Sequence, residues 1–285
     1  MAKLLCIGIA TLDIINEVAH YPCEDDEVRI IRQTKRRGGN ASNTAVVLSQ
    51  LGHQSYWAGT LVDEVDAQLV REDFNNYHIN YHYCQHVAEG KLPTSYITLN
   101  RENGSRTICH FRDSPEFSFN AFKRIPLEQF TWLHFEGRNC EQTLRMLAYI
   151  KEYYPQICVS LEIEKSRKAI EALIPLADII LFSKVYAQSC GFDSAKPFCL
   201  FMGQKYVQQK IFCGWGSSGA AAVDHNQYYW QDAPSINAID TIAAGDVFNA
   251  VVIDQQIRQQ TMAQTLASAC QCAARQCEHR GLKLS

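Results

Sequence analysis

Residues 240–246 combine two carboxylates with a run of small residues, an arrangement that could support group-transfer chemistry. Asp246 closes the segment, and Ala243, Ala244 and Gly245 come directly before it. The apolar residues that follow recur at helical spacing, which predicts that the small residues lie at a helix N-terminus. Backbone N–H groups there attract phosphate, and a carboxylate beside the bound anion can take a proton from an attacking hydroxyl. The segment therefore predicts phosphoryl transfer to an alcohol.

The same segment, taken alone, is also typical of an ordinary helix start. Small residues are common before helices, and an aspartate in a first turn is a favourable partner of the helix dipole. The choice between the two interpretations depends on the rest of the chain.

The composition limits the classes of protein to consider. The chain has 285 residues and 47% apolar content, enough for one large α/β domain with a sizeable core. Its net charge of −3 predicts no attraction to nucleic acid or to an anionic membrane surface. No signal peptide and no run of about 18 apolar residues are found, so we expect a cytoplasmic protein.

Strand-like runs alternate with helical runs along most of the chain. The predicted strands are residues 4–9, 54–58, 132–135, 157–163, 179–182 and 210–213. The predicted helices are residues 40–51, 64–75, 141–154 and 166–176. Strands interleaved with helices indicate βαβ units, and hence a mainly parallel sheet with helices on both faces.

One region departs from this alternation. Two strand-like runs within residues 94–111 flank a turn-rich segment, which predicts a hairpin. Residues 27–31 form another strand-like piece, and together these pieces suggest a small antiparallel sheet acting as a lid. The alternative is an ordinary hairpin at a sheet edge. We expect a single domain over residues 1–285, with lid strands drawn from about 14–37 and 93–113.

Four separated motifs resemble the signatures of the ribokinase-like carbohydrate kinases, also called PfkB-type kinases. Asp13 follows the first predicted strand, and residues 37–43 resemble the sugar-binding signature of that family. Residues 214–219 resemble its nucleotide-binding turn, and residues 240–246 resemble its anion-hole signature. The order and spacing agree over nearly the whole chain. The resemblance implies a ribokinase-like three-layer α/β sandwich with a mainly parallel central sheet and a small β-sheet lid.

Local stretches are most similar to the ketohexokinase group within this family, namely residues 104–108, 134–139, 160–165 and 182–184. The resemblance implies ATP-dependent phosphorylation of a primary hydroxyl of a small sugar, with a ketohexose such as fructose giving fructose 1-phosphate. A ribokinase-type, other sugar or nucleoside kinase stays open, as does a non-catalytic sugar sensor on the same fold. A nicotinamide-dependent oxidoreductase is disfavoured because Gly-x-Gly-x-x-Gly is absent after the first strand.

The resemblance also implies the residues that bind the sugar. Asp13, Asn40 and Asn43 have the donors and acceptors that sugar hydroxyls need, and Gly39 lets the substrate approach the backbone. Asn40 could instead cap the helix that follows. Glu136 ends a predicted buried strand, the edge where open α/β sheets bind ligands, and we assign it to the sugar or metal region.

The nucleotide end of the site rests on the resemblance in the same way. Arg106 is expected on the lid near the transferring phosphate, the alternative being a solvated hairpin charge. Gly216 and Gly219 would turn the chain against the nucleotide, and Lys184 would face its phosphates or simply end a strand in solvent. The implied cofactors are ATP and Mg²⁺, with K⁺ activation left open. A homodimer formed through the lid is implied as well.

Two positions depart from the family pattern. Ala243 stands where the anion-hole signature usually has glycine, and its methyl group could hinder a left-handed backbone or the approach of phosphate. Residues 183–186 replace the Asn-x-x-Glu pattern with which many relatives position metal and phosphate. The metal ligands therefore stay unidentified.

Overall fold

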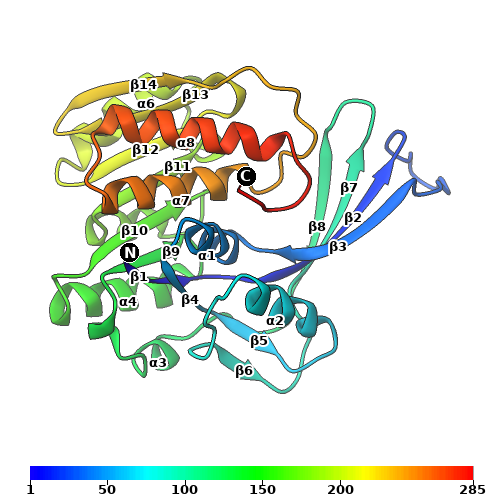
Figure 1. The fold of residues 1–285 in the computed structure, drawn as a ribbon, viewed down its shortest axis with the longest axis horizontal. Coiled ribbons are helices and arrows are strands. Elements are labelled where there is room, and N and C mark those ends of the chain that lie inside the picture. Colours follow the sequence, from blue (N-terminus) through cyan, green and yellow to red (C-terminus); the bar gives the residue numbers. More distant parts are fainter. Residues whose placement is uncertain (285) are drawn as a thin grey trace.

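The computed structural model describes residues 1–284, and a large sheet runs through the centre of this part of the chain (Figure 1). The strand order is β14-β13-β12-β11-β10-β9-β1-β4. Neighbouring strands are parallel from β4 to β12, and the pairs β12–β13 and β13–β14 are antiparallel, so that β13 alone runs against the other strands of this sheet. The strands are β1 Lys3–Ile7, β4 Gln54–Ala58, β9 Trp132–Glu136, β10 Cys158–Ile163, β11 Ile179–Ser183, β12 Lys210–Gly214, β13 Gly219–Asp224 and β14 Gln227–Asp232.

Helices cover both faces of this sheet (Figure 1). One face carries α1 Asn40–Gln50, α2 Asp66–Asn76, α7 Ala244–Ile257 and α8 Met262–Cys277. The other carries α3 Phe119–Phe122, α4 Cys140–Tyr153, α5 Lys184–Ser189, α6 Ala195–Lys205 and the 3₁₀ turns η1 Leu127–Gln129 and η2 Ile170–Leu176.

The two-faced burial follows from the strand sequences. In β1, Leu5 and Ile7 pack into one hydrophobic cluster, and Leu4 and Cys6 pack into the other. Successive side chains of a strand point to opposite faces, so a strand that is covered on both sides needs a continuous apolar run. The expected α/β class with a mainly parallel central sheet is confirmed. Within residues 1–284, no helix combines the length and the apolar character that a membrane crossing requires.

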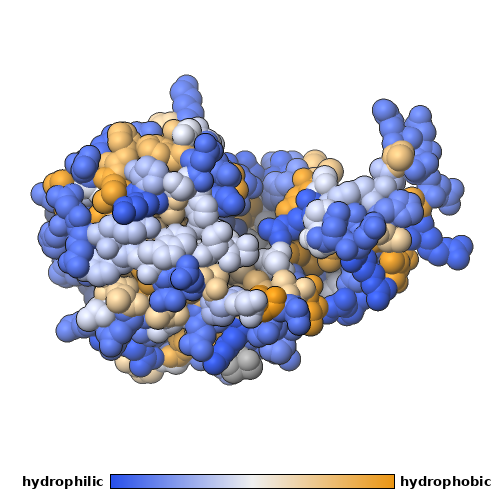
Figure 2. Space-filling model, turned by 90° about the horizontal axis from the view of Figure 1, so that it is seen from above, coloured by the Kyte–Doolittle hydropathy of each residue, from blue (hydrophilic) through white to orange (hydrophobic). Residues whose placement is uncertain are grey.

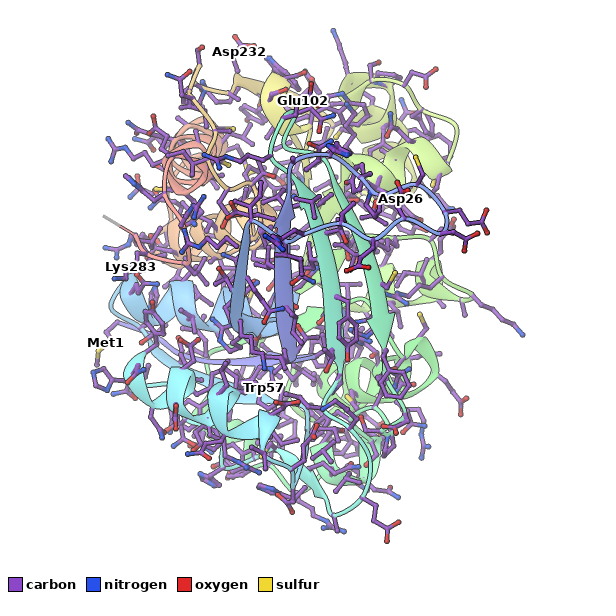
Figure 3. The ribbon with its side chains drawn as sticks, turned by 90° about the vertical axis from the view of Figure 1, so that its right-hand side faces the viewer. Met1, Asp26, Trp57, Glu102, Asp232 and Lys283 are labelled. Atoms are coloured by element: carbon purple, nitrogen blue, oxygen red, sulfur yellow. The ribbon has the colours of Figure 1, made fainter. Side chains whose placement is uncertain are left out.

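A second, four-stranded sheet projects from the body of the molecule (Figures 1 and 3). Its order is β3-β2-β7-β8, in which β2 and β7 are parallel and the two outer pairs are antiparallel. Figure 3 shows the four strands side by side, with Asp26 in the β2–β3 loop and Glu102 in the β7–β8 turn. The strands are β2 Thr11–Val18, β3 Arg32–Gly38, β7 Thr94–Asn100 and β8 Arg106–Phe111; β5 Thr60–Val62 and β6 Gln85–Val87 form a separate short pair.

The strand expected at residues 27–31 is wrong. The strand of this region is β3, which begins at Arg32 and consists mostly of polar and basic residues. It forms an edge of the small sheet, where charged side chains stay in water and block further pairing. Antiparallel pairing with β2 therefore outweighs the local β propensity of the preceding residues.

The helix expected at residues 166–176 is also wrong. Only the 3₁₀ turn η2 forms there, and it contains Pro175. Proline has no backbone N–H, and its ring clashes with the carbonyl four residues earlier, so an α-helix does not form through this position.

Candidate active site

The N-terminus of α7 carries the small residues identified in the sequence. Ala243 is the N-cap and has a left-handed backbone with φ 67°, the conformation that the usual glycine adopts freely. Among residues 1–284, no hydrogen bond uses the backbone N–H of Ala243, Ala244 or Gly245. A side chain at Gly245 would meet no atom within 4 Å outside the helix's own backbone, so the space beside the first turn of α7 is open. The arrangement suits a phosphate group, because these N–H groups carry the positive end of the helix dipole.

Asp246 lies one residue further along α7 and is only 6% exposed. Its Oδ2 atom accepts a hydrogen bond from Asn43 Nδ2 of α1 at 2.7 Å. Burial raises the pKa of Asp246 to about 8, against the opposing effect of the Asn43 hydrogen bond. A carboxylate with a pKa close to neutral is well matched to accept a proton at physiological pH.

A second buried carboxylate, Glu162, lies at the carboxyl end of β10. Its Oε1 atom accepts a hydrogen bond from Asn40 Nδ2 at 2.9 Å, and within residues 1–284 its buried Oε2 atom has no partner. Burial raises the pKa of Glu162 well above its usual value, and the charges of Asp246, Glu136 and Glu164 add to the increase. Sequence reasoning assigned no role to Glu162. The signal that could have identified it is the one used for Glu136, a carboxylate near the end of a buried strand.

Each of the two asparagines of α1 therefore donates a hydrogen bond to one of the two buried carboxylates, Asn40 to Glu162 and Asn43 to Asp246. α1 begins at Asn40, and its N-cap is Gly39, which makes no side-chain capping bond. The alternative that Asn40 caps this helix is thus wrong, because its amide reaches Glu162 instead. Asn40 and Asn43 are three residues apart, so both project from the same face of α1.

Asp13 lies on β2 beside the start of α1 and is buried. Its Oδ1 atom accepts a hydrogen bond from Thr11 Oγ1 at 2.8 Å, and burial raises the pKa of Asp13. A side chain at Gly38 would come within 2.1 Å of this carboxylate, and one at Gly39 within 2.3 Å of the Ile9 carbonyl. Both glycines are therefore needed for the close packing of the chain around Asp13.

Glu136 ends β9 and is also buried. Its Oε2 atom accepts a hydrogen bond from the Ile9 N–H at 3.0 Å, and its Oε1 atom accepts one from Arg138 Nη1 at 2.9 Å. Arg138 also forms an ion pair with Glu116 at 2.7 Å. Glu136 thus ties the ends of β1 and β9 together at the edge of the sheet where Glu162 lies, and sequence reasoning did not single out Arg138.

Arg106 begins β8 of the small sheet and reaches the segment before α7. Its Nη1 atom donates a hydrogen bond to Thr241 Oγ1 at 2.8 Å. Arg36 of β3 makes a parallel contact, because its Nη1 atom lies 2.8 Å from Asp240 Oδ2. Two arginines of the small sheet therefore contact the loop that leads into the α7 N-terminus.

A cavity of about 310 Å³ borders this cluster. Its wall includes Asp13 from β2, Asn43 from α1 and Ala243 from the α7 N-cap. This volume is within the range of small-molecule sites. Three segments that are far apart in the sequence therefore meet around one cavity.

The residues expected to bind the nucleotide lie in a different environment. Lys184 is exposed at the start of α5, and its Nζ atom lies 5.7 Å from the ring centre of Trp215. Gly216, the next residue, has φ 64° and begins the 3₁₀ turn η3, Gly216–Ser218, with open space where a side chain would be. A side chain at Gly219 would lie 2.1 Å from the Gln231 carbonyl oxygen. The close pairing of β13 with β14 is therefore a sufficient reason for glycine at this position.

The residues present do not form a metal centre of their own. Within residues 1–284, no group of three or more His, Cys, Asp or Glu side chains is arranged to hold a metal ion. Mg²⁺ in phosphotransferases usually keeps several waters and is bound by substrate phosphates with one or two carboxylates.

Comparison with known proteins agrees with this geometry. The profile of the pfkB family of carbohydrate kinases matches residues 1–285. The chain is 34% identical to ketohexokinase of Mus musculus, over 98% of this chain and 97% of that protein. It is 24% identical to ribokinase of Staphylococcus aureus, over 90% of this chain and 87% of that protein.

A structural comparison gives the same fold. Arabidopsis thaliana ribokinase complexed with ribose and ATP superposes with a TM-score of 0.82 and 17% identity, covering 98% of this chain and 94% of that chain. The expected ribokinase-like architecture is confirmed. From the family match over its whole length, the chain belongs to the pfkB family of carbohydrate kinases, which are ATP-using phosphotransferases with an alcohol group as acceptor.

Proposed function

We propose that this protein transfers the γ-phosphate of ATP to a primary hydroxyl of a ketohexose, with fructose converted to fructose 1-phosphate. The 34% identity to ketohexokinase extends over nearly the full length of both chains, whereas the identity to ribokinase is 24%. The proposal for the substrate rests on this difference in similarity.

The observation that supports the mechanism is the position of Asp246 beside the open N-terminus of α7. In the proposed reaction, Asp246 takes the proton from the acceptor hydroxyl. The resulting alkoxide attacks the γ-phosphorus, the bond to the bridging oxygen breaks, and ADP leaves. The backbone N–H groups of Ala243, Ala244 and Gly245 stabilise the charge that develops on the transferring phosphoryl group.

The acceptor sugar is proposed to lie over the carboxyl ends of β1 and β9, against Asp13, Gly39, Asn40, Asn43 and Glu136. Buried polar groups require partners, since each one left unpaired costs about 1–3 kcal/mol. Sugar hydroxyls are suitable partners because each can both donate and accept. On the nucleotide side, Lys184, Gly216 and Gly219 are proposed to contact ATP, together with Mg²⁺, and K⁺ activation stays open.

The small sheet is proposed to act as a lid on this single domain, with Arg106 contacting the transferring phosphate. The sheet also carries exposed apolar side chains, namely those of Tyr96, Ile108 and Phe111. Figure 2 shows apolar patches among the hydrophilic residues of the projecting arm. Because such side chains at a projecting surface favour association, we propose a homodimer formed through the lid.

The test is ADP release with MgATP against fructose, ribose, other simple sugars and adenosine. We expect turnover on fructose, with NMR of the product placing the phosphate on C1, and a turnover lower by about 10²–10⁴-fold in the Asp246→Asn variant. Turnover on ribose or adenosine alone would replace the ketohexose proposal with the ribokinase-type or nucleoside-kinase alternative. Sugar-dependent thermal stabilisation without any turnover would favour the non-catalytic sensor.

A further inference from the structure

The guanidinium of Arg37 is buried behind the proposed catalytic base. Arg37 is only 6% exposed, and its guanidinium group is surrounded by polar side chains with which it forms hydrogen bonds. Its Nε atom donates to Asp73 Oδ2 of α2 at 2.6 Å. Its Nη1 atom donates to Ser42 Oγ at 2.8 Å and to Asn43 Oδ1 at 2.7 Å. A continuous chain of hydrogen bonds thus runs from α2 to Asn43, and from there to Asp246.

The direction of donation along this series of hydrogen bonds decides how the Asn43 amide is oriented. A guanidinium has only donors, so the end of the amide that faces Arg37 must be the carbonyl oxygen. The NH₂ end is then directed at Asp246, where it donates the 2.7 Å hydrogen bond to Oδ2. The opposite orientation would place NH₂ against the guanidinium, a contact without an acceptor, and the carbonyl oxygen against the carboxylate, a contact without a donor.

Both ends of the Asn43 amide are engaged before any sugar binds. Its oxygen is held by Arg37 and its nitrogen by Asp246. The side chain thus holds the carboxylate, and its second N–H and its second lone pair are left for the proposed contact with the sugar.

We propose that Arg37 is a positioning residue for phosphoryl transfer, which orients the Asn43 amide so that Asn43 holds Asp246 in place as the proton acceptor. Asp73 anchors the outer end of this chain. The inference rests on the proposed function, because it assumes that Asp246 is the general base.

The charges around Asp246 show why the donor matters. Glu136 of β9, Glu162 of β10 and Glu164 just beyond it all favour the protonated form of Asp246. The opposing groups are the Asn43 amide and the positive charge of Arg37. Loss of a donor to the carboxylate raises its pKa, so a smaller fraction of Asp246 is ionised and able to act at a given pH.

A purely structural role for Arg37 makes a different prediction. The guanidinium also lies over the Phe74 ring at 5.7 Å and pairs with Asp73, so its loss will lower stability in either case. A structural role alone leaves the pH dependence of catalysis and its coupling to Asn43 unchanged. These two quantities therefore separate the interpretations.

The experiment compares the pH profiles of kcat/KM for the wild type and Arg37→Met with MgATP and the sugar that is turned over. We expect the acid limb to move to higher pH by about one unit, which corresponds to one charge-assisted hydrogen bond. At pH 7, kcat should then fall about tenfold, with the sugar KM changed by less than about threefold. An unshifted acid limb would overturn the inference.

A double-mutant cycle sharpens the test. If Arg37 acts through Asn43, Arg37→Met should have little further effect on kcat in an Asn43→Ala background, whereas independent effects would multiply. Arg71→Met is the matched control, because it removes another arginine–aspartate pair of α2, Arg71–Asp63, away from the site. Multiplying effects in the cycle would contradict the inference.

Two further variants keep the test decisive. If Arg37→Met does not fold, Asp73→Asn loosens the outer end of the chain at a side chain that is 30% exposed. The acid limb should move in the same direction by a smaller amount, and an unchanged limb would count against the proposal.

Normal turnover by Asp246→Asn would reject the proposed function itself. A strongly impaired Asp246→Asn variant together with an unshifted Arg37→Met profile would reject only this inference.

Discussion

The proposed acceptor side and the proposed nucleotide side of this site are built differently. On the acceptor side, Asp246 and Glu162 are buried, and each is hydrogen-bonded to an asparagine of α1. On the nucleotide side, Lys184 is exposed and Gly216 faces open space. The difference indicates that groups proposed to move a proton are held in place before substrate arrives, whereas the groups proposed to bind ATP remain free to adjust.

The burial on the acceptor side also has a cost in stability. A carboxyl group whose pKa is raised on folding binds more protons in the folded state than in the unfolded state. Its contribution is therefore unfavourable above its unfolded pKa, and stability falls as pH rises toward the folded pKa. For Asp246 this window extends from about pH 4 to about pH 8.

The variant expected to change the acceptor side most is Asp246→Asn. Removal of the proposed general base should lower kcat by about 10²–10⁴-fold, with a modest change in sugar affinity. Because the variant also removes an unfavourable buried charge, its melting temperature at pH 8 should exceed that of the wild type by roughly 2–4 °C. Steady-state kinetics and thermal denaturation at pH 8 provide both measurements. A large loss of sugar affinity with unchanged kcat would contradict the assignment.

On the nucleotide side, Lys184→Met should raise the KM for ATP. The loss of one charge-assisted contact to phosphate corresponds to about 10–100-fold. The sugar KM should stay within about twofold, because Lys184 belongs to the other side of the site. Exposed Lys196→Met, on α6, is the control for the loss of a surface charge. An unchanged KM for ATP would leave Lys184 as a solvated residue at the start of α5.

Glu162→Gln should shift the acid limb of the pH profile in the direction opposite to the shift expected for Arg37→Met. Removal of a neighbouring negative charge should lower the pKa of Asp246 and move the acid limb of kcat/KM to lower pH, by about one unit. Burial also raises the pKa of Glu162, so the charged form is unfavourable in the folded state. The variant should therefore be more stable than the wild type at pH 8, and this difference in stability should be smaller at pH 5. Melting temperatures at the two pH values, together with the pH profile, test both effects. A shift of the limb to higher pH would refute the electrostatic account.

Ala243→Gly should have the smallest effect. Glycine relieves the left-handed strain at φ 67°, worth about 1–2 kcal/mol, but restores about 0.5–1 kcal/mol of conformational entropy to the unfolded chain. We therefore expect a gain of up to about 1.5 kcal/mol in the free energy of unfolding, with kcat unchanged or raised by less than about threefold. Urea denaturation and initial rates would measure both quantities. A clear loss of stability would mean that the alanine methyl group makes compensating contacts.

Much of the architecture could be predicted from local patterns. The buried strands of the central sheet and the start of α7 at the small residues follow from apolar runs and helical spacing. The strand wrongly expected at residues 27–31 and the helix wrongly expected at residues 166–176 have separate causes. The position of the strand depends on the pairing of β3 with β2, a contact that local sequence patterns do not report. The helix was excluded by a local signal, Pro175, that the interpretation did not take into account.

The sequence by itself determined which chemistry is available: the motif at residues 240–246, the asparagines at the start of α1, and the order of motifs that identifies the family. Only the tertiary structure decided how these groups are partnered. Asn43 and Asp246 are 203 positions apart, and Asn40 and Glu162 are 122 positions apart. Spacing along the chain reports local backbone geometry, whereas the burial that raises the pKa of Asp246 and the amide that opposes it depend on neighbours in space. For that reason the motif could be found by reading the chain, but the roles proposed for Glu162 and Arg37 could not.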